Sequence, residues 1–147
     1  MFRNILIATD GSALSEKLLG PGPALARALG AKITGLHVIP EHLPAFSGEM
    51  AWVNETLRAR FRQGARETGN RYLDRVEAAA RAAGVPFERV LAQNDHVWKG
   101  IIATAEARGC DLILMAAHGR RGLSGLLLGS ETNRVLVHSR VPVLVYR

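Results

Sequence analysis

A glycine-rich segment that follows a short apolar run holds the residue types best suited to chemistry. The apolar run extends from Leu112 to Ala117, and the segment after it ends at Gly129-Ser130, where a helical pattern begins. Its glycines are Gly119, Gly122, Gly125 and Gly129. Glycine allows a backbone to approach a phosphate, and the N–H groups in the first turn of a helix can bind it. The pattern indicates an anion site, although glycine loops also join strands to helices without binding a ligand.

An aspartate stands at the end of another apolar run, near the N-terminus. The run from Asn4 to Thr9 is followed by Asp10-Gly11-Ser12. A carboxylate is the kind of oxygen ligand that Mg²⁺ uses beside nucleotide phosphates. Asp-Gly is also typical of a turn, and Ser12 is suited to be the N-cap of the next helix. Asp10 is therefore either a metal partner or a turn-former.

The other reactive side chains indicate no further chemistry. The five histidines show no metal-ligand spacing, no G-x-S-x-G elbow is present, and the glycine-rich segment lacks the lysine of a P-loop. His118 precedes the glycines, and a structural role is preferred to contact with a ligand. Cys110 is the single cysteine, and we interpret it as a small buried hydrophobic residue rather than a reactive thiol. No catalytic residue is predicted.

Strand and helix patterns alternate along the chain and must position these residues. Strands are predicted at 4–9, 32–39, 87–92, 112–117 and 141–146, and helices at about 12–30, 51–83, 94–108 and 129–138. Gly20-Pro21-Gly22-Pro23 should kink or divide the first helix, and Gly30 should end it. The order predicts an α/β fold: a doubly wound, five-stranded, mostly parallel sheet with helices on both faces. Ligands bind such sheets at the carboxyl ends of the strands, where the strand order reverses.

The long predicted helix carries many of the charges. Its apolar face is predicted to contain Leu57, Phe61, Ala65, Thr68, Tyr72, Val76, Ala79 and Ala83. Arginines elsewhere on it alternate with acidic residues, so we interpret this surface as a solvated mixed-charge face. The net charge of +6 favours anionic partners, but aromatic residues are few and nucleic-acid binding is not expected.

Length and composition indicate one globular domain, residues 1–147. A single cysteine suits a reducing compartment. The N-terminus has no signal-peptide pattern, and no apolar run approaches the ~20 residues needed to span a bilayer. We expect a cytoplasmic protein that makes no membrane contact.

Together these segments resemble the universal stress protein family over nearly the whole chain. The resemblance lies in I-L-I-A-T-D-G-S at the start, L-H-V-I in the second strand, and the stretch from Asp111 to the end. The ATP-binding branch of that family carries Gly-x2-Gly-x9-Gly-Ser/Thr. Gly119, Gly129 and Ser130 match this motif, whereas Ala116 stands where the first glycine would be.

The resemblance implies an adenine-nucleotide site with Mg²⁺, for ATP or, as alternatives, AMP or ADP, in a stress-response regulator with weak or no catalysis. Asp10 would lie near the metal and Val38 would hold the adenine through its backbone. The full set of implied nucleotide-binding residues is Ala8, Thr9, Asp10, Val38, Met115, Ala116, Gly119, Gly129, Ser130, Glu131 and Thr132. Ser130 would also be the N-cap of the last helix. The family further implies a homodimer that pairs through the strand Val141 to Tyr146.

Two residues argue against nucleotide binding. Ala116 would be strained if its backbone needed a positive φ, and its methyl group could crowd a sugar. Glu131 would place a carboxylate beside the phosphates if its side chain pointed inward. The alternative is a nucleotide-free stress protein of the same fold that acts through a protein partner.

Overall fold

The computed structural model describes residues 1–42, 55–118 and 128–147 of the chain. Strands and helices alternate along it, with one short 3₁₀ turn. The strands are β1 (Asn4–Ala8), β2 (Lys32–Ile39), β3 (Phe87–Gln93), β4 (Leu112–Ala116) and β5 (Val143–Tyr146). The helical elements are α1 (Ala13–Glu16), η1 (Lys17–Leu19), α2 (Pro21–Leu29), α3 (Glu55–Ala82), α4 (Val97–Ala107) and α5 (Ser130–His138).

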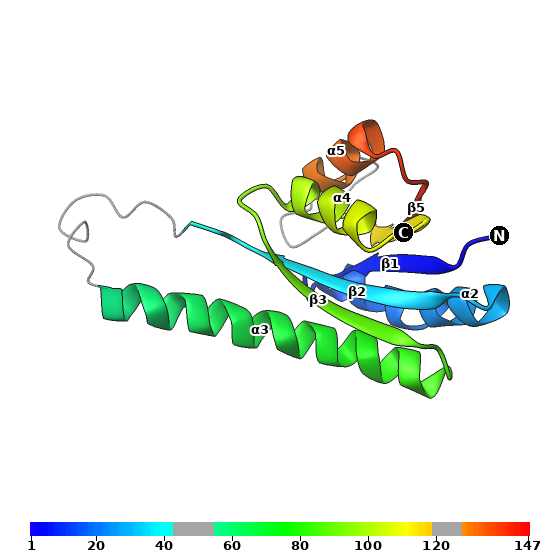
Figure 1. Ribbon diagram of the computed structural model, residues 1–147, viewed down its shortest axis with the longest axis horizontal. Coiled ribbons are helices and arrows are strands. Elements are labelled where there is room, and N and C mark those ends of the chain that lie inside the picture. Colours follow the sequence, from blue (N-terminus) through cyan, green and yellow to red (C-terminus); the bar gives the residue numbers. More distant parts are fainter. Residues whose placement is uncertain (43–54, 119–127) are drawn as a thin grey trace.

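The strands form one five-stranded sheet in the order β3-β2-β1-β4-β5, and every pairing is parallel. Helices α2 and α3 cover one face of the sheet, and α4 and α5 cover the other (Figure 1). Successive side chains of a strand point to opposite faces, so Ile5 and Ile7 of β1 join the core under α2 and α3, whereas Leu6 joins the core under α4 and α5. The predicted doubly wound α/β fold is confirmed, and the sheet is parallel throughout.

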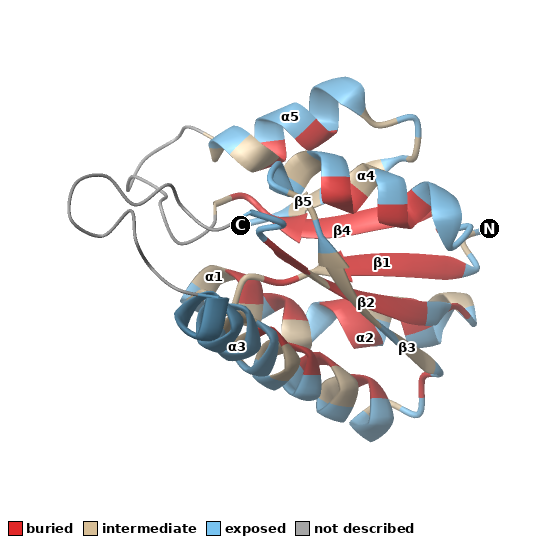
Figure 2. Ribbon diagram, turned by 60° about the vertical axis from the view of Figure 1, so that its left-hand side comes forward, coloured by how far each residue is buried: buried red, intermediate tan, exposed pale blue. Residues whose placement is uncertain are grey.

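Burial follows this arrangement. The central strands β1 and β4 are buried along nearly their whole length, while both edge strands are only partly buried (Figure 2). Continuous apolar runs are typical of strands covered on both faces, which explains why β1 and β4 were recognisable from sequence. Among the described residues, no helix is long and apolar enough to cross a membrane.

Hydrogen bonds fix the amino ends of the central strands. The Asp111 carboxylate accepts hydrogen bonds from the backbone N–H groups of Arg3, at 2.8 Å, and Asn4, at 3.0 Å. The Asn4 side chain donates to the carbonyl of Arg108 and accepts from the hydroxyl of Thr34, at 2.8 Å. Buried polar groups need such partners to offset their desolvation. These bonds therefore hold β1, β2 and the start of β4 in register.

The first helical region is divided, as predicted. Ser12 is the N-cap of α1, and its hydroxyl accepts from the backbone N–H of Ser15 at 3.2 Å. The 3₁₀ turn η1 separates α1 from α2, which begins at Pro21. Proline is tolerated at the start of a helix, where its missing N–H has no intrahelical role. Gly30, with φ 65°, ends α2 as expected.

The buried face of α3 differs from the predicted one. The buried residues are Gly69, Leu73, Val76 and Ala80. Only Val76 was among those predicted, and Leu57 and Phe61 are 37% and 49% exposed. The first turns of α3 extend past the ends of the neighbouring strands (Figure 1), and Leu57 and Phe61 there line an open hollow together with His37 and Ile39 of β2 instead of packing tightly against the sheet. Further along α3, the predicted face contained Tyr72, but the fully buried residue is its neighbour Leu73.

Several other predicted boundaries were wrong by a few residues. Helix α4 begins at Val97 rather than Asn94, because the Asn94 side chain accepts from the N–H of His96 and holds a turn there. The N-cap of α5 is Gly129, so the prediction that Ser130 is the N-cap was wrong. The last strand begins at Val143 rather than Val141, after a turn in which Val141 N donates to the Ser139 hydroxyl. Strands β1 and β4 each end one residue earlier than predicted, and β3 ends one residue later.

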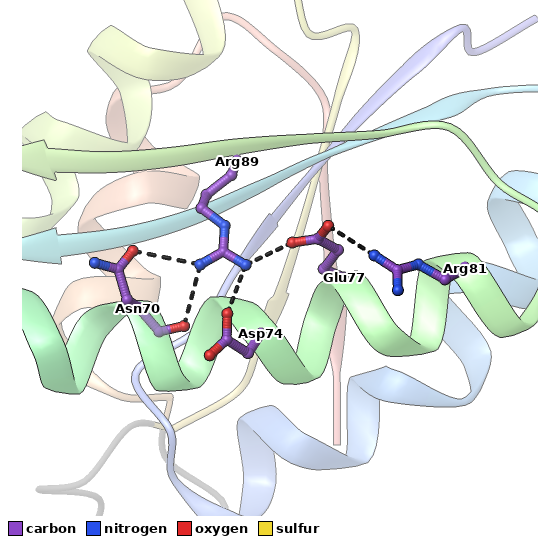
Figure 3. A network of polar contacts seen from close by, with 5 residues as sticks. All are labelled: Asn70, Asp74, Glu77, Arg81 and Arg89. Atoms are coloured by element: carbon purple, nitrogen blue, oxygen red, sulfur yellow. Dashed lines mark hydrogen bonds and ion pairs between the residues drawn. The ribbon is translucent and has the colours of Figure 1, made fainter.

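A polar network joins α3 to the edge strand β3 (Figure 3). The guanidinium of Arg89 on β3 donates to Asp74, at 2.6 Å, and to Glu77, at 2.5 Å. Glu77 also pairs with Arg81 one turn later, at 3.2 Å. The hydrogen bond from Arg89 holds the pKa of Glu77 below its ordinary value. Asp74 and Glu77 therefore attach α3 to the sheet through Arg89. The sequence predicted only a solvated mixed-charge face for this helix.

We expect Arg89→Met to lower the urea midpoint of unfolding at pH 7. The pKa of Glu77 is lowered in the folded chain, so this interaction stabilises the fold above the ordinary glutamate pKa and is lost as pH falls through the lowered one. The difference from wild type should therefore shrink below about pH 4. Arg81→Met is the control, because Arg81 contacts Glu77 but does not join two elements. An equal loss in both variants would contradict the prediction.

Candidate functional site

The carboxyl ends of β1 and β4 lie side by side at the point where the strand order reverses. β1 pairs with β4 through Ile5↔Leu112, Leu6↔Ile113 and Ile7↔Leu114. From this pair the chain continues toward β2 on one side and β5 on the other. Such a point leaves a crevice at the sheet's edge, and it is where α/β proteins bind ligands.

The turn after β1 is held by a dense set of hydrogen bonds. Thr9 N donates to the carbonyl of Leu36 at 2.9 Å, and the carbonyl of Thr9 is 2.8 Å from Nδ1 of His37. The Thr9 hydroxyl accepts from Gly11 N at 3.2 Å. The half-buried Asp10 accepts from Ser12 N at 3.0 Å through Oδ1. The predicted turn-forming role of Asp10 is confirmed, and its metal role stays a prediction.

Gly11 is required in this turn for two reasons. Its φ of 71° lies in the left-handed region that other residues rarely adopt. A Cβ there would also lie 2.2 Å from Cε1 of the Tyr72 ring. The Tyr72 ring of α3 therefore packs directly against the backbone beside Asp10.

The exit from β4 is tied to the start of α5. Gly129 N donates to the carbonyl of Ala117 at 2.8 Å, and the Thr132 hydroxyl donates to the carbonyl of Ala116 at 3.0 Å. Thr132 is buried. The chain thus returns to the end of β4 after leaving it, and the first turn of α5 is fixed at the rim. Gly119 lies outside the described residues, so its place in the motif stays a prediction.

Ala116 is not strained. No described residue other than glycine has a positive φ, and Ala116 is an ordinary buried strand residue. Its side chain belongs to the core under α2, on the face opposite Met115. The alanine therefore requires no unusual backbone, and its methyl group points away from the face that holds the other predicted base and sugar contacts.

Three of the predicted residues form an apolar wall on the α4 side of the sheet. Val38 and Met115 belong to the core under α4 and α5, and Ala8 packs against it. They come from the adjacent strands β2, β1 and β4, and each lies at or near a carboxyl end. The structure thus brings together predicted residues that are 30 to 107 positions apart in sequence.

The first turn of α5, which is bonded to the end of β4, has backbone N–H groups that lie outside the helical ladder. The first bond within the helix runs from Asn133 N to the carbonyl of Gly129, at 2.9 Å. The N–H groups of Ser130, Glu131 and Thr132 therefore precede the intrahelical ladder. Gly129 supplies no side-chain cap. This is the donor arrangement that anions bind at helix N-termini.

The Glu131 side chain does not take up this position. Its Oε2 accepts from the backbone N–H of Trp98 in α4, at 2.8 Å, and its Oε1 is 3.7 Å from Nη1 of Arg134. The carboxylate is therefore engaged with α4 and with the next turn of its own helix. The sequence objection that Glu131 would repel a phosphate depended on an inward orientation that the structure does not show.

A second group of side chains, which the sequence did not predict, lies at the same edge of the sheet. Glu41, His42 and Asp95 come together where β2 ends and β3 connects to α4. Asp95 Oδ1 accepts from the N–H groups of Glu41 and His42, and its Oδ2 lies 2.5 Å from His42 Nδ1. The hydrogen bond to Asp95 raises the pKa of His42, and the bonds from His42 lower the pKa of Asp95.

These three side chains are close enough to share a metal ion, but all are exposed. Asp95 already accepts several hydrogen bonds, so we interpret the group as a polar connection between the two strand ends. The sequence signals this group only through polar residues that follow each of the two strands. Those residues can be placed together only when β2 and β3 are known to be neighbours.

The comparisons with known proteins agree with this fold. The model of the universal stress protein family matches residues 1–147. Universal stress protein YxiE of Bacillus subtilis is 30% identical over 149 residues, and a universal stress protein of Thermus aquaticus is 31% identical over 148; each alignment covers all of both chains. A crystal structure of a family member from Burkholderia pseudomallei superposes with a TM-score of 0.75 at 25% identity, over 99% of this chain and 96% of that one. The chain belongs to the universal stress protein family.

We expect Gly11→Ala to destabilise the fold by more than about 2 kcal/mol. The left-handed backbone costs alanine about 1–2 kcal/mol, and contact with the Tyr72 ring adds an overpacking cost of about 1–3 kcal/mol. Gly30→Ala is the matched control, since Gly30 has a similar φ of 65° and nothing within 4 Å of its added Cβ. It should lose only the backbone contribution. Urea unfolding measures the free energy of unfolding of both variants. Equal losses would contradict the prediction, because they would show that the Tyr72 ring moves aside at no cost.

Proposed function

We propose that this chain binds an adenine nucleotide, ATP in the first instance, at the rim formed by the ends of β1 and β4, and acts as a nucleotide-responsive stress regulator in the cytoplasm. The observation that carries the proposal is the first turn of α5. Its backbone donors precede the helical ladder, have no side-chain cap from Gly129, and lie at the end of β4, the strand that pairs with β1 before the Asp10 turn.

Each part of the nucleotide has a matching group in this site. The phosphates would accept hydrogen bonds from the N–H groups of Ser130, Glu131 and Thr132, with Gly119 and Gly129 leaving room for their oxygens. The adenine would lie against Val38 and bond to its backbone, while Ala8, Thr9 and Met115 would border the sugar together with the backbone of Ala116. Asp10 would hold the Mg²⁺ that accompanies the phosphates. The proposal concerns binding, and it assigns no residue to hydrolysis.

Structures of the same fold support the choice of an adenine nucleotide. One universal stress protein was crystallised in complex with cAMP and superposes with a TM-score of 0.71 at 19% identity. The structure of another, from Archaeoglobus fulgidus, is of a complex with dAMP and superposes with a TM-score of 0.65 at 16% identity. At these identities the likeness concerns the fold alone. The choice of nucleotide for this chain therefore rests on its own rim residues.

A thermal melt with Mg-ATP tests the proposal, with Mg-GTP as the control. Ligand at a hundred times its Kd adds about 2.7 kcal/mol to the free energy of unfolding. For a domain of this size, that corresponds to a rise in Tm of roughly 5–10 °C. No rise at millimolar ATP would refute nucleotide binding and favour the alternative, a nucleotide-free protein that acts through a protein partner.

We expect Gly129→Ala to weaken ATP binding at least about tenfold, or about 1.4 kcal/mol, while the unliganded Tm stays near wild type. Gly129 has φ −59° and ψ 151°, which alanine adopts without strain. Any loss of affinity would therefore come from the methyl group displacing a phosphate. Calorimetric titration measures the affinity, and wild-type affinity in the variant would place the phosphates elsewhere.

We further propose that two chains pair through the last strand, as the family resemblance implied for Val141 to Tyr146. β5 is an edge strand, and its exposed face carries Leu144 and Tyr146. Ile113 N donates to the carbonyl of Pro142, and Ala117 N donates to that of Tyr146. Backbone groups alternate along a strand, so those of Val143 and Val145 point away from β4. An edge of this kind can pair with another chain.

Val145→Pro should convert the dimer to a monomer. Proline removes an N–H that points outward, so the bonds between β4 and β5 should remain. Val145→Ala is the control, because it loses side-chain volume but retains the N–H. Light scattering after size-exclusion chromatography should give the mass of two chains for wild type and the control, and of one chain for the proline variant. A dimeric proline variant would refute pairing through this edge.

A further inference from the structure

Glu131 belongs to the first turn of α5, yet its side chain caps a different helix. Trp98 is the second residue of α4, and its N–H donates to Glu131 Oε2 at 2.8 Å. The N-cap of α4, His96, makes no side-chain cap bond of its own. The first turn of α4 therefore depends on an acceptor that lies 33 residues further along the chain. A carboxylate also suits the positive end of a helix dipole.

The same two helices meet again along α5. The His138 ring lies over the Trp98 ring, with centroids 4.8 Å apart and planes inclined by 30°. Glu131 and His138 are about two turns apart, so they lie on the same face of α5. Trp98 is thus held by α5 at both its backbone and its indole ring. Figures 1 and 2 show α4 and α5 lying side by side over the sheet.

Helix α4 in turn packs closely against Val38. A Cβ on Gly100, one turn beyond the start of α4, would lie 2.9 Å from Val38 Cγ1 and 3.1 Å from Cγ2. Such distances leave no space between the helix backbone and that side chain. A shift of the first turn of α4 must therefore move Val38 or open a gap beside it.

We propose that Glu131 is a positioning residue that couples the phosphate-binding turn of α5 to Val38 through α4. The inference rests on the proposed function, in which these are the two ends of the nucleotide site. The backbone N–H of Glu131 would bind phosphate, while its side chain holds the helix that supports the adenine contact. The side chain acts through α4 and does not itself touch the nucleotide.

A purely electrostatic role for Glu131 predicts opposite results. Removing a negative charge beside the phosphates would strengthen ATP binding, and removing the positive charge of Arg134 would weaken it. A positioning role predicts that Glu131→Ala weakens ATP binding, because α4 loses its cap. It also predicts that Arg134→Ala has no effect on ATP binding. Arg134 contacts Glu131, and among the described residues no bond joins Arg134 to Trp98. Glu131→Gln removes the charge but keeps an oxygen that can accept from Trp98 N.

The first test needs no nucleotide. Hydrogen exchange of the Trp98 amide, followed by NMR in the full chain, should be at least several-fold faster in Glu131→Ala than in wild type. Glu131→Gln should restore much of the protection, and Arg134→Ala should match wild type. An unchanged Trp98 exchange rate in Glu131→Ala would overturn the inference, whatever the protein does with ATP.

The second test measures Mg-ATP affinity in the same variants. We expect binding to weaken by about two- to thirtyfold in Glu131→Ala, the range that loss of a helix cap allows, with recovery in Glu131→Gln. Tighter binding in both Glu131 variants would overturn positioning and support the electrostatic role. Failure of wild type to bind ATP would refute the proposed function, and the exchange experiment would still decide whether Glu131 holds α4.

Discussion

The rest of the structure depends on the parallel pairing of β1 with β4. The chain leaves β1 toward β2 through α1 and α2, and leaves β4 toward β5 through α5, so the connecting helices cover opposite faces. Asp111 fixes the amino ends of the pair by accepting from Arg3 and Asn4. The carboxyl ends are left at the edge of the sheet, where β1 leads into the Asp10 turn and the first turn of α5 is bonded to the end of β4. The site is thus a consequence of the strand order.

Much of this could be predicted because the signals were local. Apolar runs marked the central strands, the four-residue stretch from Gly20 to Pro23 marked the break between α1 and α2, and Ser12 marked an N-cap. Strand and helix alternation then determined the parallel sheet. The resemblance implied Ala8, Val38 and Met115 as site residues, and the strand order brings them together, because residues at the ends of neighbouring strands lie close to one another.

The errors came from contacts between elements distant in sequence. Helical periodicity in Leu57 and Phe61 was real, but nothing local indicates where the sheet beneath α3 ends. The orientation of the Glu131 side chain could not be predicted, because its partner Trp98 lies on another helix. The cluster of Glu41, His42 and Asp95 required knowing that β2 pairs with β3. Each case concerns a side chain whose orientation is set by tertiary packing rather than by its own segment.

The single cysteine gives this protein a practical property. Cys110 is 6% exposed, and burial raises the pKa of its thiol, so little reactive thiolate forms near neutral pH. A cysteine introduced on the surface, for example at Val137, which is 67% exposed on α5, would then be the thiol that maleimide reagents modify first. The native chain is in effect already a cysteine-free background for fluorescent or spin labelling, and labels on the helices above the sheet could follow their movement in solution without further engineering of the core.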